Sequence, residues 1–271
     1  MKKNIPHFLL FMGIVLLLSG CKGIYEPNVV NMPLLEEKRE YTVTVSHKNI
    51  QVAYALKNHL AVMGNAFYTN IPTNTEIGYQ ELGEGGKGIL VEGAVGYFNY
   101  YPDLDITFET YAGLGYGHSN FSYNSRDNNG NLVPQTFNSN GFKYFIQPDI
   151  GFKTKYFDWA LGTRFSAIEY LNPTITNAKA NIPNDRYSSV GTTTYIFLEP
   201  ALTLRFGFRR IKLQVQYIHS MKLNNSPLYY TDYSLNAGLF FNFNNSKLKG
   251  PQFPKFPKFP KRSRKTDERK G

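Results

Sequence analysis

Histidine and serine are adjacent at two places in this 271-residue chain, His118-Ser119 and His219-Ser220. A serine hydroxyl within hydrogen-bond reach of an imidazole can act as a nucleophile activated by a base. Both pairs, however, fall in segments where apolar and polar residues alternate, which is the pattern of a β-strand. Neighbouring side chains of a strand point to opposite faces, so neither pair can act together. The five histidines also lack metal-ligand spacing, and we predict no metal and no cofactor.

Alternation of period two is the dominant pattern of the chain, and it decides where most polar side chains point. Short connections alternate with long ones between these segments. We expect long loops at roughly 70–86, 119–141, 169–192 and 222–231. This pattern predicts an all-β fold, a closed antiparallel transmembrane β-barrel of about ten strands over residues 40–245. The predicted strands are 40–47, 49–56, 59–69, 87–100, 104–118, 142–154, 155–168, 193–206, 210–221 and 232–243.

A soluble barrel is the alternative to a membrane barrel. It would turn the apolar faces inward and cover its outside with lysine and glutamate. Here the polar faces are rich in glycine and alanine, and small side chains suit a crowded lumen better than a solvated surface. The 20 tyrosines and 21 phenylalanines also gather near strand ends, where the aromatic girdles of membrane barrels lie. We therefore predict that the apolar faces contact lipid.

Charged side chains share the predicted interior. One hypothesis is that they pair with each other and plug the barrel, because buried charges need partners. The other is that they bind a small polar ligand or select ions. Ten strands enclose little more space than side chains fill, so the plug is favoured and a general porin is not. The predicted lumen network is Glu92, Glu109, Asp149, Arg164, Glu199 and Arg205, with Asp158, Lys143, Lys153 and Lys212 on the same face.

The amino terminus has the pattern of an export signal. Lys2 and Lys3 precede a short apolar core, which is followed by Leu-Ser-Gly-Cys ending at Cys21. This core is too short to cross a bilayer, so residues 1–20 are predicted to be removed. The four residues resemble the lipobox of bacterial lipoproteins, which implies a lipid on Cys21. The alternative is an ordinary cysteine, and as the sole cysteine it cannot form an intramolecular disulfide. Residues 21–39 are predicted to be a lipidated, extended tether.

The carboxyl-terminal segment, 246–271, carries the basic excess of the chain, with ten basic and two acidic residues. The rest of the mature chain is balanced, so bulk charge gives no support to nucleic-acid binding. Three Phe-Pro-Lys triplets fit a polyproline II helix with one row of rings and one of ammonium groups. This tail is either a disordered periplasmic extension or a peptide that docks into a protein partner. The candidate partner-binding residues are Phe253, Phe256, Phe259, Lys255, Lys258 and Lys261.

Residues 53–63, 145–152 and 198–202 resemble strands of small outer-membrane β-barrel lipoproteins of Gram-negative bacteria. The resemblance implies a fold and an outer-membrane location, but the family carries no settled activity. Short turns would face the periplasm, and an even strand number would put both termini there. We expect a non-enzymatic structural or interaction component, such as a subunit of a larger envelope complex. The alternatives are a narrow conduit or binder for a small solute, and a lipid-modifying enzyme. In outer-membrane lipid A deacylases, however, histidine and serine stand two residues apart on one face of a strand. In this chain they are adjacent and point to opposite faces.

Overall fold

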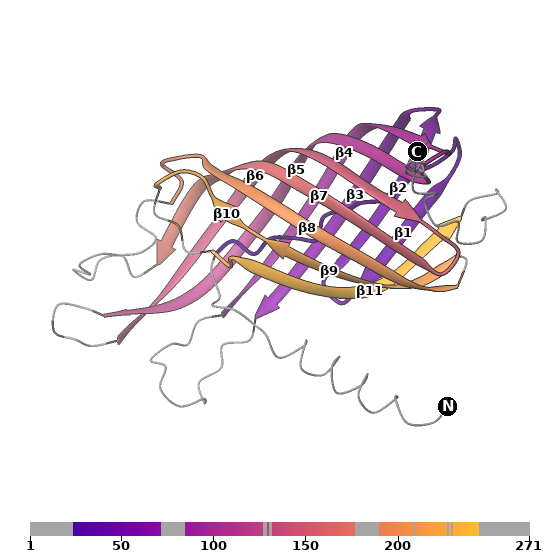
Figure 1. The fold of residues 1–271 in the computed structure, drawn as a ribbon. Coiled ribbons are helices and arrows are strands. Elements are labelled where there is room, and N and C mark those ends of the chain that lie inside the picture. Colours follow the sequence, from indigo (N-terminus) through magenta and orange to yellow (C-terminus); the bar gives the residue numbers. More distant parts are fainter. Residues whose placement is uncertain are drawn as a thin grey trace, which may run out of the picture.

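The computed structural model describes residues 24–71, 85–126, 129, 132–176, 190–208, 210–226, 228 and 230–243. In these residues, ten long antiparallel strands form a closed barrel, which confirms the predicted fold class (Figure 1). Strands β1 to β9 pair in chain order, and β11 pairs with both β9 and β1 to close the ring. The strands are β1 (Tyr41–Ser46), β2 (Asn49–Lys57), β3 (Leu60–Ile71), β4 (Gly85–Tyr101), β5 (Ile106–Arg126), β6 (Leu132–Lys153), β7 (Phe157–Thr176), β8 (Tyr195–Phe208), β9 (Ile211–His219) and β11 (Tyr233–Phe243). The two-residue strand β10 (Met221–Lys222) extends β9 along β8.

The two faces of the barrel have opposite characters. On β8, Ile196 and Phe206 point outward with 42% and 48% of their surface exposed, whereas Arg205 points inward and is 2% exposed. The same division runs round the barrel, because the described strands expose many large apolar side chains and bury most of their charged ones. Water-soluble proteins show the reverse distribution. An apolar outside and a polar lumen are the arrangement of a membrane-spanning barrel.

Three strands are longer than the sequence predicted. Strand β5 continues to Arg126, β6 already begins at Leu132, and β7 continues to Thr176. The predicted loops 119–141 and 169–192 are therefore wrong over much of their length. Their asparagines and serines are typical of loops, yet antiparallel pairing of β5 with β6 continues from Ile106 to Arg126. Inward aromatic side chains at Phe121 and Phe137, both buried, maintain the alternation along this extension.

The barrel has two distinct ends. The chain reverses after β1, β3, β5, β7 and β9 at one end, here called the long-loop end. It reverses after β2, β4, β6 and β8 at the other, the short-turn end, where β11 finishes opposite the start of β1. No helix in the described part of the chain is long and apolar enough to cross a membrane.

Residues 24–40, here called the plug segment, run through the lumen along the barrel. At the long-loop end Tyr25 bridges to Tyr230, and the Thr231 N–H donates to the Tyr25 carbonyl at 2.8 Å. At the short-turn end the Arg39 N–H donates to the Ala55 carbonyl at 2.9 Å. The segment is the indigo trace inside the barrel in Figure 1, and it turns directly into β1.

The plug segment corrects two predictions. A tether over 21–39 is wrong for residues 24–35, because nearly all of them are buried. Their apolar side chains bury surface inside the barrel that a tether would expose to water. Placement of both chain ends on one side holds for the ends of the barrel, because Tyr41 pairs with Phe243 at the short-turn end, but not for the plug segment, whose Ile24 lies at the long-loop end. The predicted signal 1–20, Cys21 and the tail 246–271 lie outside the described residues.

Candidate functional site

The charged centre of the lumen is organised around Asn28 of the plug segment. Its Nδ2 donates to Glu92 Oε2 at 2.7 Å. Its Oδ1 accepts from Lys143 Nζ at 2.8 Å and from Arg164 Nη1 at 2.9 Å. Lys143 and Arg164 lie 3.4 and 3.6 Å from Glu92 Oε1. One neutral amide therefore connects a carboxylate on β4 with cations on β6 and β7, and all of these groups are buried.

Glu199 lies nearer to the long-loop end. The Tyr25 hydroxyl donates to Glu199 Oε1 at 2.5 Å, and Lys143 Nζ is 3.6 Å from Oε2. The Tyr25 ring also stacks on Phe197, with ring centroids 4.6 Å apart. A buried carboxylate requires such partners, because it has left the water that would otherwise solvate it. At this level of the barrel the plug segment supplies one of these partners, the Tyr25 hydroxyl.

Glutamines hold the backbone in the middle of the plug segment. Gln216 accepts from the Val30 N–H and donates to the Val30 carbonyl, both at 2.8 Å. Gln51 donates to the Val29 carbonyl at 3.0 Å, and Gln147 donates to the Asn31 carbonyl at 2.6 Å. A buried peptide group without a partner is costly, so an extended chain in a lumen needs donors and acceptors from the wall. Side-chain amides supply both.

The same principle applies toward the short-turn end, where charged side chains bind the backbone. Arg205 Nη2 donates to the Met32 carbonyl at 2.6 Å. The two Glu109 oxygens accept from the Leu34 and Leu35 N–H groups, each at 2.8 Å. Lys153 donates to the Leu34 carbonyl at 2.8 Å.

The wall also provides space for the plug segment. A Cβ added at Gly162 would lie 2.7 Å from Met32 Sδ, and one at Gly151 would lie 2.9 Å from Leu34 Cδ2. Atoms do not approach so closely without displacement, so any larger residue would compete with the plug segment for volume. Small residues on the inner face, which the sequence indicated for a crowded lumen, are here matched to particular plug side chains.

Ion pairs with Lys153 hold the plug segment where it leaves the lumen at the short-turn end. Lys153 contacts both Glu40 and Glu36, the latter at 3.5 Å. Asn242 of β11 donates to Glu40 at 2.8 Å. Burial raises the pKa of the Glu36 carboxyl above its usual value, and the positive charge of Lys153 opposes part of this rise.

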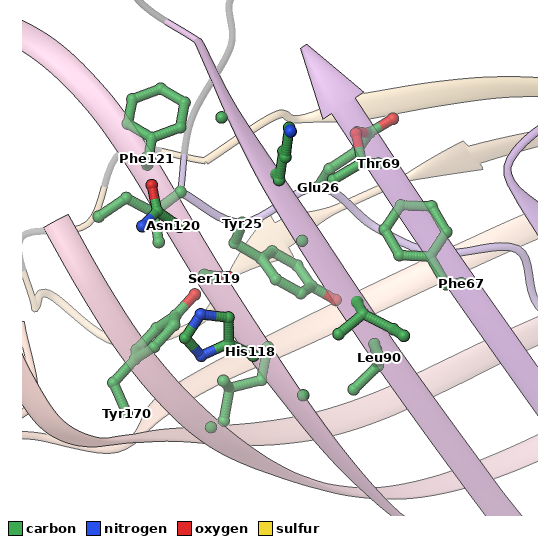
Figure 2. A pocket seen from close by; sticks show the side chains of 18 of the residues that line it. Tyr25, Glu26, Phe67, Thr69, Leu90, His118, Ser119, Asn120, Phe121 and Tyr170 are labelled. Atoms are coloured by element: carbon green, nitrogen blue, oxygen red, sulfur yellow. The ribbon is translucent and has the colours of Figure 1, made fainter. Parts of the chain in front are cut away.

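An aromatic cluster surrounds the first residues of the plug segment at the long-loop end. Beside it is a cavity of about 90 Å³, shown in Figure 2, where Tyr25 lies between the walls formed by neighbouring strands. The wall has glycine at Gly88, Gly117 and Gly141, so no side chain fills this space. Apolar and aromatic groups dominate the lining, with a few polar groups among them: Tyr25, Phe67, Leu90, Phe121, Ile168 and Tyr170, with Glu26, Thr69, Ser119 and Lys143.

The structure buries all six residues of the predicted lumen network. Glu92 and Arg164 come together, and Glu199 reaches the same group through Lys143. Asp149 accepts from Gln147 at 2.6 Å. Glu109 and Arg205 bind the plug backbone, although the sequence suggested that facing charges would pair with each other. Asn28 and the three glutamines were missed. The apolar run Val-Val-Asn-Met-Pro-Leu-Leu at 29–35 was a usable signal, because an exposed tether has no reason to be apolar.

The histidine and serine pairs do not form a catalytic arrangement. His118 is exposed on the outer face and lies 2.9 Å from Asn140 Oδ1. Ser119 points to the other side of β5, and both His118 and Ser119 border the cavity at the long-loop end. Ser220 is buried and His219 is not, as expected for adjacent strand residues. Within the described residues, no group of three or more acidic, histidine or cysteine side chains could hold a metal ion. The candidate tail residues, Phe253, Phe256, Phe259, Lys255, Lys258 and Lys261, lie outside the described part.

Comparison with known proteins gives a distant structural likeness. No protein-family model matches the chain, and no curated protein matches it. Among solved structures, it is similar to a major outer membrane protein from Thermus thermophilus, with 12% identity and a TM-score of 0.37. The match covers 75% of this chain and 99% of the Thermus chain. The class of protein follows from the barrel itself. Its closed ring, apolar outside and polar lumen define an outer-membrane-type β-barrel.

Proposed function

We propose that this protein is a non-enzymatic, lipid-anchored component of the outer membrane of a Gram-negative bacterium, closed to solutes by its own plug segment. The observation that carries this proposal is that the plug segment binds charged side chains of the wall at several levels of the lumen. Glu199 is bonded to Tyr25, Glu92 to Asn28 and Arg205 to Met32, so the charged groups that would select a solute are already engaged. The role that remains is structural, or the presentation of loops and tail to other envelope proteins.

The orientation belongs to the same proposal. Short turns face the periplasm in outer-membrane barrels, and longer loops face the exterior. The long-loop end is therefore assigned to the cell exterior. The basic tail follows β11 at the short-turn end, which puts it in the periplasm, where it would meet an acidic or aromatic-lined protein partner.

Conductance in planar bilayers tests the closed lumen. The parent protein should give no steady conductance. Replacement of residues 29–35 by seven glycine and serine residues removes the apolar side chains but keeps the chain length, and it should open a measurable path. The matched control is the same seven-residue replacement at 253–259 in the tail, which should stay silent. A steadily conducting parent would favour the conduit instead.

The cavity at the long-loop end favours a second candidate function, the binding of a small aromatic solute. Its lining offers ring faces from Phe67, Phe121 and Tyr170, with the hydroxyl of Ser119 as a polar contact. Binding to the folded state raises stability. Phenol or indole should therefore raise the unfolding temperature of the parent, and Leu90→Trp, which fills the cavity, should abolish this rise. If both proteins respond alike, the cavity is not the binding site.

A further inference from the structure

The direction of the plug segment decides on which face of the membrane the amino-terminal end emerges. Its carboxyl-terminal part joins β1 at the short-turn end, where Asn242 donates to Glu40. Its first residues lie at the opposite end, where Tyr25 bridges to Tyr230 and Glu26 forms an ion pair with Lys48 at 2.6 Å. The segment therefore runs through the lumen from the long-loop end to the short-turn end.

The filled lumen leaves no room for the chain before Ile24 to return to the short-turn end. Wall side chains bind the backbone from Val29 to Leu35. The cavity beside Tyr25 measures about 90 Å³ and lies at the long-loop end, so it offers no path toward the short-turn end. A returning polypeptide chain needs far more room. The chain that precedes Ile24 must consequently leave the barrel at the long-loop end.

Covalent geometry extends this conclusion to Cys21. Three residues span at most about 11 Å even when fully extended. The hydrocarbon core of a bilayer is about 30 Å thick, so Cys21 cannot reach the short-turn face from the position of Ile24. It is restricted to the neighbourhood of the long-loop end whatever conformation residues 21–23 adopt.

We infer that the lipid on Cys21 inserts into the external leaflet, with the amino-terminal end on the cell surface and the barrel spanning beneath it. The inference rests on the proposed lipid anchor and on the proposed orientation. It replaces a tether that would join the barrel to the periplasmic leaflet. The partner of this end of the molecule is the lipid surface on the exterior side, and the tail is on the opposite side of the membrane.

An insertion between Gly23 and Ile24 that carries an epitope and a site-specific protease site tests the inference. Cells are grown with radiolabelled palmitate, then treated intact with the antibody or the protease. We expect the antibody to bind intact cells and the protease to separate the lipid label from the barrel. The same insertion in the connection between β3 and β4 reports the orientation, and one after Lys249 should respond only after the membrane is opened. Cys21→Ala should carry no lipid label.

The outcomes distinguish a failure of the inference from a failure of the proposed orientation or of the proposed lipid anchor. If the β3–β4 insertion is accessible on intact cells but the one before Ile24 is not, the inference is overturned while the orientation stands. If both are protected on intact cells and the one after Lys249 is accessible on them, the orientation and with it the inference fail. If the parent takes up no palmitate, the proposed lipid anchor is wrong, and the chain carries no lipid that could insert into the external leaflet.

Discussion

The Gln216 carboxamide pairs with the backbone of Val30 as a neighbouring strand would. Its Oε1 accepts from the Val30 N–H and its Nε2 donates to the Val30 carbonyl, both at 2.8 Å. Two residues of an antiparallel sheet exchange the same two hydrogen bonds. A single side chain on β9 thus supplies the plug segment with the pairing that a strand obtains from another strand.

Replacing this glutamine by leucine should destabilise the barrel. Gln216→Leu leaves the two backbone groups of Val30 buried without a partner, and each such group costs about 1–3 kcal/mol. The temperature at which the folded, faster-migrating band is lost on electrophoresis should fall. Tyr217→Leu, on the outward face of the same strand, is the control and should shift it less. Equal shifts in both variants would mean that Gln216 does not support the plug segment.

The charge on Glu199 should also contribute to stability. Glu199→Leu removes the acceptor of the Tyr25 hydroxyl and one anionic partner of Lys143. Breaking a buried ion pair costs roughly 3–5 kcal/mol, and the lower end applies here because Lys143 keeps Glu92 at 3.4 Å. Urea unfolding in detergent should show the loss. The double variant with Lys143→Met should recover part of it. A single variant as stable as the parent would point to a wet lumen.

Steric competition at Gly162 offers a test of the plug segment that alters no charge. Gly162→Val places side-chain atoms where Met32 Sδ now lies, since even a Cβ would approach it to 2.7 Å. The plug segment should shift and single-channel openings should appear in planar bilayers. Adding Met32→Ala should close them again. Gly93→Val is the matched control, because no atom lies within 4 Å of a Cβ added there. Openings in the control would locate the leak elsewhere.

The tail should be dispensable for the barrel. Deletion of residues 249–271 removes the Phe-Pro-Lys triplets but leaves β11, which ends at Phe243. Heat-modifiable migration should be unchanged, while a periplasmic partner should disappear from a cross-linked pull-down. Replacement of Phe253, Phe256 and Phe259 by serine should have the same effect on the partner if the ring row is the contact. A truncated chain that no longer inserts would show that the tail belongs to the fold.

Alternation predicted the barrel well because it reflects a physical boundary. Each strand separates lipid from lumen, so the side chains of β9 divide into outward Ile211 and Tyr217 and inward Lys212 and Gln214. The same rule placed Glu199 and Arg205 inside. Strand ends near Arg126 and Thr176 were harder to predict, because the asparagines, serines and threonines there are typical of loops.

The plug segment escaped prediction for a different reason. It satisfies its backbone through side chains of the wall, so it needs no strand neighbour and shows no period. Its interactions also join residues far apart in sequence, such as Asn28 with Arg164, and no local pattern reveals them. The apolar residues Val29, Val30 and Leu34 were the local sign of burial, and they do not identify the surface that covers them.

The seam between β1 and β11 closes the ring between the first and last strands, so its contacts have the greatest sequence separation in the barrel. Contacts of this kind form at a high entropic cost and tend to form late. The plug segment is continuous with β1, and Glu40 is bonded across the seam to Asn242. A barrel that closed empty would have to admit this chain endwise, past the aromatic side chains around Tyr25. During biogenesis, we therefore expect the strands to wrap around a segment that is already in place, before the seam between β1 and β11 closes.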